Sequence, residues 1–174
     1  MSQVKWFDRK FDFSSQQNIF PAIIERLWGT PLRLKERVLN LPEDVLDMKL
    51  DSTWSVKENI GHLIDSEPLW QGRLEDILAE EKYLRPMDLA NTRTDDAHHN
   101  ESEVGDLLER FQEVRTSTIE QLSGLDECDI FKFALHPRLE QPMRTQDLFL
   151  FVAEHDDHHP ARITAIAKMA SNIS

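Results

Sequence analysis

The chain has 174 residues, with 32 acidic and 20 basic side chains and a formal net charge of -12. This length suits one domain with a full hydrophobic core, and we expect a single domain over residues 1–174. The acidity argues against binding to nucleic acid or to an anionic membrane surface, because basic patches serve those purposes. The single cysteine, Cys128, excludes an internal disulfide framework and a cysteine-based zinc cluster.

The N-terminal stretch MSQVKWFDRKFDF lacks the uninterrupted apolar region of a signal peptide. No apolar run approaches the ~20 residues that a membrane-spanning helix needs. We therefore expect a cytoplasmic protein that does not associate with membranes.

The first expected helix begins near Ile19 and carries apolar residues at helical spacing. Pro21 suits its first turn, where no intrahelical amide donor is needed. Gly29 and Pro31 then predict a kink or a restart before the pattern resumes as far as Leu41.

The second expected helix begins at SVKE, residues 55–58, a capping-box pattern in which serine and glutamate each satisfy the other's backbone amide. A long apolar stripe then runs from Ile60 to Leu78. A polar connection is expected over residues 81–100. A third helix is expected over residues 101–122, with Ser123-Gly124 as its stop.

Residues 125–142 contain two prolines and are expected to be irregular. The fourth helix is expected from Thr145, as its N-cap, to Ala170, with Asp147 favourable in the first turn. Four long amphipathic segments without a convincing alternating strand predict an all-α fold, an antiparallel four-helix bundle.

Three of the seven histidines fall in EHDDHHPARI, residues 154–163. His155 and His159 lie one turn apart within the apolar stripe of the fourth helix, and His158 lies at the edge of that stripe. Two imidazoles at this spacing can chelate one divalent ion. The alternative is two buried histidines that hydrogen bonds satisfy. Pro160, directly after His159, removes an amide donor and is expected to bend or strain the helix there.

A tight site needs a third ligand, and the sequence offers His62, His98, His99 and His136. Only His62 lies inside an expected helix, and it flanks the apolar stripe of that helix rather than centring it. Periodicity alone therefore leaves the third ligand open.

WSVKENIGHLIDSEPLWQGRL (residues 54–74) and AEHDDHHPARI (residues 153–163) together resemble the DinB superfamily and, within it, the DinB/YfiT-like metal-dependent hydrolases. The family pattern is a tryptophan and a capping serine, a histidine eight residues after the tryptophan, and an HxxxH pair on the last helix. The resemblance implies an up-down-down-up bundle in which His62, His155 and His159 bind one divalent ion, such as nickel, zinc or iron. Because dimers are common in the family, the resemblance also implies a homodimer as one possible assembly. It further implies that His158 is a pocket or orienting group rather than a ligand.

Acidic neighbours are candidates to accept the remaining ring protons of these histidines. Glu58 lies one turn before His62 and Asp65 nearly one turn after it; the alternative for each is an acid in solvent. Arg162, one turn from His158, is a candidate to bind an anionic substrate group, or else to pair with a nearby acid.

Three neutral imidazoles would leave an ion with its charge and an open coordination position, where it could acidify water, hold a thiol or polarise a carbonyl. The resemblance implies the same range: a hydrolase, a transferase that uses a low-molecular-weight thiol, or a thiol-dependent isomerase, acting on a small molecule. Two further hypotheses remain open. One is a metal- or ligand-binding stress protein without turnover. The other is a plain bundle whose histidines are structural, with dimerisation as one role for it.

Overall fold

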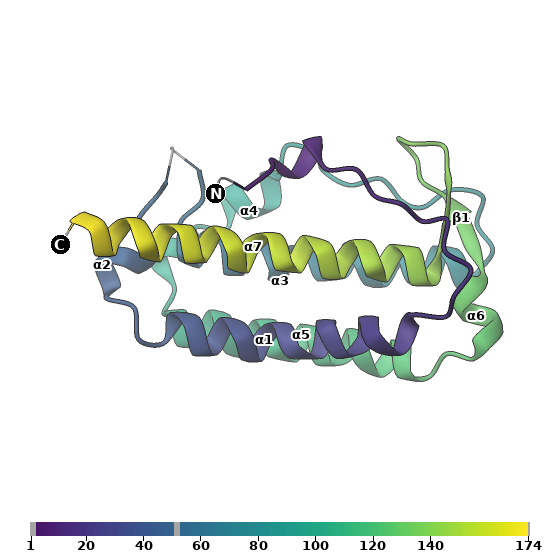
Figure 1. Ribbon diagram of the computed structural model, residues 1–174, viewed down its shortest axis with the longest axis horizontal. Helices are drawn as coiled ribbons and strands as arrows, with labels where there is room; N and C mark the ends of the chain where they lie inside the picture. The colour runs from purple at the N-terminus through teal and green to yellow at the C-terminus, as the bar shows by residue number, and fades with distance from the viewer. Residues whose placement is uncertain (1–2, 51–52, 174) are drawn as a thin grey trace.

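The computed structural model describes residues 3–50 and 53–173, and its frame is a bundle of four long helices (Figure 1). These are α1 (Phe20–Val38), α3 (Val56–Leu78), α5 (Val104–Ser123) and α7 (Thr145–Ile173). Helices α1 and α7 run in one direction, and α3 and α5 run in the other. Each of α1 and α3 packs against both α5 and α7. The predicted up-down-down-up four-helix bundle is therefore confirmed. Of the expected single domain over 1–174, residues 1–2, 51–52 and 174 lie outside the described part.

Short elements precede α1 and lie in the connections between the long helices. They are η1 (Trp6–Asp8), α2 (Glu43–Leu46), α4 (Thr92–Asp96), η2 (His99–Glu101), α6 (Glu127–Phe131), β1 (Phe133–Leu135) and β2 (Pro142–Arg144). The two strands pair antiparallel, with Ala134 opposite Met143. The expectation of a wholly irregular segment over 125–142 is wrong, because elements of three to five residues are too short to show a period.

Helix α1 runs without interruption from Phe20 to Val38, so the restart expected at Gly29 and Pro31 does not occur. Pro31 has no amide hydrogen to donate to the carbonyl of Leu27. The structure supplies another donor, because Nη1 of Arg115 on α5 lies 3.4 Å from that carbonyl oxygen. Tertiary contact thus compensates for the missing helical hydrogen bond.

The starts of the later helices differ in how they are capped. Ser55 and Glu58 form the predicted capping box of α3. Thr145 is the first residue of α7 and not its cap, since its hydroxyl donates to the carbonyl of Asp129 at 2.7 Å. The carboxylate of Asp147 accepts instead from the backbone amide of Arg144 at 3.0 Å. Helix α7 also continues through Pro160 and ends three residues beyond the predicted Ala170.

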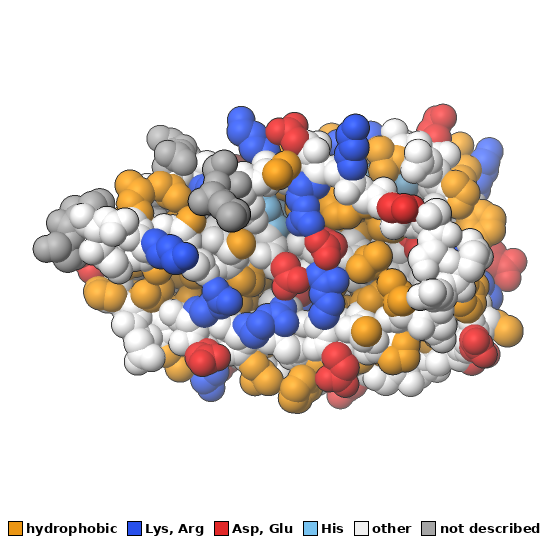
Figure 2. Space-filling view, in the orientation of Figure 1, with side chains coloured by type: hydrophobic (Ala, Val, Ile, Leu, Met, Phe, Trp, Pro, Cys, Tyr) orange, Lys and Arg blue, Asp and Glu red, His pale blue; other side chains and the backbone are white. Residues whose placement is uncertain are grey.

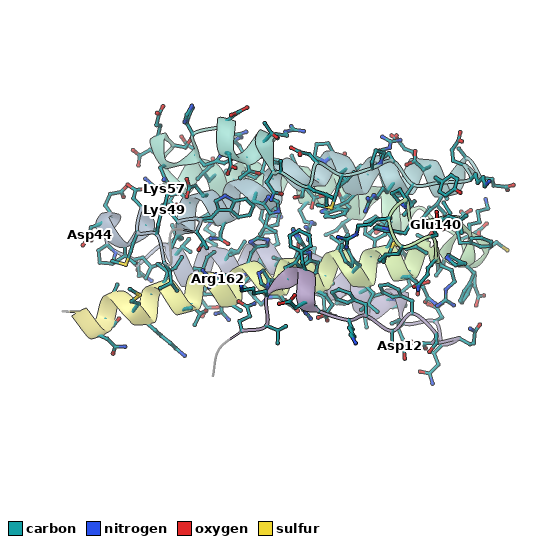
Figure 3. The ribbon with its side chains drawn as sticks, turned by 90° about the horizontal axis from the view of Figure 1, so that it is seen from above. Asp12, Asp44, Lys49, Lys57, Glu140 and Arg162 are labelled. Atoms are coloured by element: carbon teal, nitrogen blue, oxygen red, sulfur yellow. The ribbon has the colours of Figure 1, made fainter. Side chains whose placement is uncertain are left out.

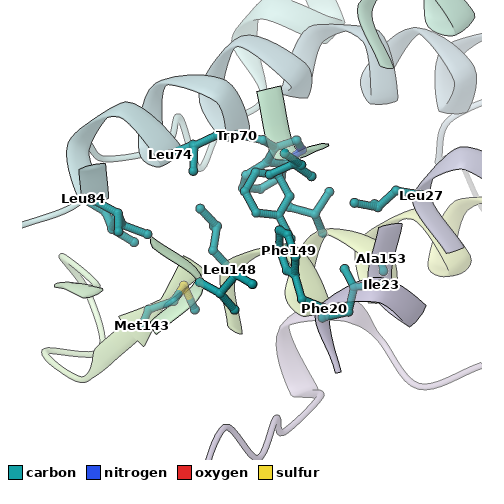
Figure 4. Packing of buried hydrophobic residues seen from close by; sticks show 14 of the residues in the cluster. Phe20, Ile23, Leu27, Trp70, Leu74, Leu84, Met143, Leu148, Phe149 and Ala153 are labelled. Carbon is teal, nitrogen blue, oxygen red and sulfur yellow. The ribbon is translucent and has the colours of Figure 1, made fainter. Parts of the chain in front are cut away.

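Two hydrophobic clusters form the core, one toward each end of the bundle. The first surrounds Trp70 and Phe149 (Figure 4), and the second contains Ile60, Phe111 and Ile163. On α7 the first cluster ends at residue 153 and the second begins at residue 163. The polar interval between them carries the histidines.

The N-terminal segment crosses the outside of α7 beside this interval (Figures 1 and 3). Arg9 contacts the carboxylate of Glu154 and donates to the backbone carbonyl oxygen of the same residue at 3.2 Å. Arg26 on α1 bonds to Glu154 as well, at 2.7 Å. Figure 2 shows the resulting band of blue and red side chains at the middle of this face. Within the described residues, no helix combines the length and the apolar character needed to cross a membrane.

Candidate metal centre

Three histidine rings from two helices converge inside the bundle. His62 on α3 places Nε2 3.2 Å from Nε2 of His155 on α7, and His159 places its Nε2 3.3 Å from the same atom. All three side chains are buried. Their ligand-capable nitrogens lie within 4.8 Å of one another. The structure therefore brings together the residues that the family resemblance implied as ligands.

Asn59 fixes the protonation of one ring. Its Nδ2 donates to the carbonyl oxygens of Trp54 and Ser55 at 3.2 and 2.7 Å. The amide oxygen of Asn59 consequently faces Nδ1 of His159 at 2.8 Å. Because an amide oxygen can only accept, Nδ1 of His159 must carry the proton. The Nε2 atom of His159 therefore presents a lone pair to the other two rings.

The remaining two rings are held differently. Nδ1 of His62 lies 3.1 Å from the hydroxyl of Thr94 on α4. Nδ1 of His155 is buried and has no hydrogen-bond partner within residues 3–50 and 53–173. Packing orients this ring instead, between Trp6 at 5.1 Å and Trp70 at 5.6 Å between centroids.

Burial keeps all three rings neutral at neutral pH. Desolvation lowers the pKa of His62 to about 4, because the charged imidazolium loses its hydration. The pKa values of His155 and His159 are lowered well below 6.5, first by burial and then by the neighbouring histidines. Neutral imidazole is the form that binds a metal.

The donor set and its spacing fit a divalent metal ion. Nitrogens bound to one tetrahedral ion at about 2.0–2.1 Å lie roughly 3.3–3.4 Å apart. Two of the three separations, 3.2 and 3.3 Å, agree with that value, and all three nitrogens lie within 4.8 Å of one another. An ion would also bind the lone pair that Nε2 of His159 presents in this buried space.

The histidines form one wall of a pocket of about 510 Å³. Trp54 covers His62, with ring centroids 4.4 Å apart, and anchors its indole nitrogen on Asp95 at 3.0 Å. Arg162 also lines the pocket; it lies on α7 near the N-terminal segment (Figure 3), and its Nη2 donates to the hydroxyl of Thr53 at 2.6 Å. The pocket thus combines aromatic walls with cationic groups.

The acids expected to orient the ligands have other partners. The carboxylate of Glu58 accepts from the Ser55 amide at 2.8 Å and from Lys49 at 2.7 Å. Asp65 accepts from Nε2 of His99 at 2.8 Å. Neutral side chains, Asn59 and Thr94, face the ligand rings in their place.

His158 lines the pocket, as the resemblance implied. Gln3 places its Nε2 2.8 Å from Nδ1 of His158 and 3.1 Å from the carbonyl oxygen of the same residue. The carbonyl contact orients the amide, so Nδ1 of His158 accepts and Nε2 of the neutral ring carries the proton. Desolvation, then Arg9 and Arg162, lower the pKa of His158 to about 4.

The other three candidates for a third ligand lie apart from this cluster. His98 is exposed, and the buried His99 pairs with Asp65. His136 lies in the loop between the strands, where Nδ1 accepts from the backbone amides of Arg138 and Leu139, both at 3.3 Å.

A buried charge network lies next to the histidines. Asp156 is fully buried and pairs with Arg115 of α5. Arg115 also donates from Nε to Glu67 of α3 at 2.8 Å. The network ties α3, α5 and α7 together at the level of the site.

Comparisons with known proteins agree with this fold. The sequence model of the DinB superfamily matches residues 27–163, so the chain belongs to that superfamily. A solved structure of YfiT from Bacillus subtilis, described as "a probable metal-dependent hydrolase with an unusual four-helix bundle topology", is similar to this chain with a TM-score of 0.80. The two share 24% sequence identity over 94% of each chain. A comparison with curated proteins found no match.

Proposed function

We propose that His62, His155 and His159 bind one divalent metal ion, such as nickel, zinc or iron. We further propose that the chain is a metal-dependent enzyme acting on a small molecule, either a hydrolase or a low-molecular-weight-thiol S-transferase. The observation that carries the proposal is the convergence of three buried Nε2 atoms, one of which Asn59 holds as a lone-pair donor. Membership of the DinB superfamily supports it, as does the likeness to YfiT.

Bound there, the ion would supply Lewis acidity, which acidifies water or a thiol and polarises a carbonyl. The pocket volume of about 510 Å³ lies within the range of small-molecule sites, roughly 300–1,000 Å³.

The other side chains of the pocket have distinct roles in the proposal. Asn59 and Thr94 hold two of the ligand rings in place through contacts to Nδ1 of His159 and of His62. Trp54 excludes water from the face of His62. Arg162 binds an anionic group of the substrate, and Nε2 of His158 donates a hydrogen bond to it.

The test is turnover by metal-loaded protein. The chelator-stripped chain is reloaded separately with nickel, zinc and iron, and each form is assayed with activated esters and with thiol–electrophile pairs. We expect turnover with at least one ion, lost in His155→Ala and retained in His98→Ala, where the replaced histidine is exposed. Metal binding without turnover would instead favour the non-catalytic metal-binding protein. Absence of metal binding would favour a bundle with structural histidines.

A further inference from the structure

A second cavity of about 670 Å³ lies beside the metal pocket. The two share Trp6, Phe7 and Met87 as a common wall. The N-terminal segment, the loop between β1 and β2, and residues 86–89 supply most of the remaining lining, to which α7 adds Phe151; this lining is largely aromatic and aliphatic. This size and apolar character are typical of a site for a small organic molecule.

Arg73 of α3 is a buried cation in the wall of this cavity. Its side chain is almost fully buried, with 1% relative exposure of the residue. Nε donates to the backbone carbonyl of Arg85 at 3.0 Å, whereas the buried Nη2 has no hydrogen-bond partner among the residues that the structure describes. The nearby carboxylate of Asp76 accepts instead from the backbone and side chain of Arg85, at 2.7 and 2.8 Å.

Burial lowers the pKa of Arg73 to about 10, so the guanidinium remains charged at neutral pH. A buried donor without a partner destabilises the protein, and a buried charge does so more strongly. An anion in the cavity would remove both penalties at once.

The other charged residues that line the cavity are also cationic. They are Arg9, Lys10 and Arg138, and no described lining residue is an acid. This is unexpected in a chain with a net charge of -12. His136 adds a neutral donor, because its Nδ1 accepts from two backbone amides and its Nε2 therefore carries the proton.

We propose that this cavity binds an apolar monocarboxylate, with the carboxylate on Arg73 and the apolar chain against Phe11, Met87 and Phe151. One buried cation matches one negative charge, and the guanidinium geometry suits a carboxylate. The apolar lining favours a hydrocarbon or aryl tail over a polar metabolite. The site is distinct from the three histidines and does not depend on the metal chemistry proposed above.

The test compares octanoate with octanamide, which share a chain and differ in charge. Titration calorimetry uses the full chain after chelator treatment, so that ligation of the carboxylate to a metal cannot contribute. We expect octanoate to bind with one molecule per chain and octanamide to bind at least about 30-fold more weakly, because the neutral amide leaves the charge of the buried guanidinium uncompensated.

Variants then locate the site. Arg73→Met should abolish the preference for octanoate, and Arg110→Met, which removes an exposed arginine of α5 outside the cavity, should retain it. Equal affinity for acid and amide in the wild type, or no binding of octanoate at millimolar concentration, would overturn the proposal. Unchanged octanoate binding in Arg73→Met would also overturn the proposal, as would loss of octanoate binding in His155→Ala. If Arg73→Met fails to fold, Arg73→Lys and the comparison of acid with amide in the wild type decide.

Discussion

Arg115 holds two buried carboxylates and one helix carbonyl, so its replacement by methionine is the most informative test of the core. Glu67 and Asp156 are both fully buried, and each bonds to this guanidinium. Removing one partner of a buried ion pair costs about 3–5 kcal/mol, because a charge is left without compensation. Arg115→Met should therefore lower the free energy of unfolding by about that amount.

The assay is urea unfolding followed by circular dichroism. With a slope of about 2 kcal/mol per molar urea for a chain of this size, the midpoint should fall by roughly 1.5–2.5 M. Arg85→Met is the matched control, since Arg85 pairs with Glu75 and Asp76 while its own side chain is 43% exposed. Exposed pairs contribute roughly 0–1 kcal/mol. A loss below about 1 kcal/mol in Arg115→Met would refute the reasoning, because it would mean that the buried acids find other compensation.

Three further predictions follow from single contacts. Asn59→Leu should weaken metal affinity about 10- to 100-fold, measured by chelator competition, because His159 loses the acceptor that fixes its tautomer. His136→Asn should flatten the acid dependence of stability. Burial, Arg73 and Arg138 lower the pKa of this ring from 6.5 to about 4, so the folded state binds fewer protons than the unfolded chain in that window. The contribution of His136 to wild-type stability should therefore fall as pH falls through the window, by up to roughly 1.4 kcal/mol per unit, and level off below it. The other histidines whose pKa values are lowered add their own losses of stability equally in the wild type and the variant. Gly61→Ala should destabilise the bundle by about 1–3 kcal/mol in thermal unfolding, because the added Cβ would lie 2.1 Å from the ring of the buried His99.

The first and third predictions each have a control variant, and the second has an outcome that would contradict it. Asn59→Asp retains an acceptor and should preserve most of the metal affinity. Equal pH profiles for wild type and His136→Asn would contradict the second prediction. Gly105→Ala should be tolerated, since a Cβ there meets no atom within 4 Å. The third prediction fails if Gly61→Ala is tolerated equally well.

The sequence predicts the helices well because each long helix buries one continuous stripe. The capping box at Ser55 and the stripe from Ile60 onward define α3 without tertiary information. Pro31 shows the limit of such local reasoning. This proline predicts a break in the helix. In the structure, Arg115, which lies 84 positions after Pro31 in the sequence, donates to the carbonyl of Leu27 that Pro31 leaves without a helical donor. No local pattern reveals that donor.

The metal site likewise has a part that the sequence predicts and a part that depends on tertiary packing. The spacing of His155 and His159 predicts a pair on one face, but periodicity does not select His62 as their neighbour. The orienting groups do not follow from the sequence pattern. That pattern predicts the acids Glu58 and Asp65 beside the ligand rings, whereas Asn59 and Thr94 contact them in the structure. Asn59 precedes His62 by three residues on α3, so a polar side chain in the apolar stripe was an available signal. Thr94 and Trp6 reach the site from connections whose path depends on tertiary packing.

The most direct test of the central claim is elemental analysis of the purified, untagged protein beside His155→Ala, after both are reconstituted with nickel or zinc and freed of excess metal. A three-histidine centre predicts about one ion per chain in the wild type and a large loss in the variant, with His98→Ala matching the wild type. Wild-type protein that retains no ion, or a variant that retains as much as the wild type, would contradict the assignment of His62, His155 and His159 as metal ligands.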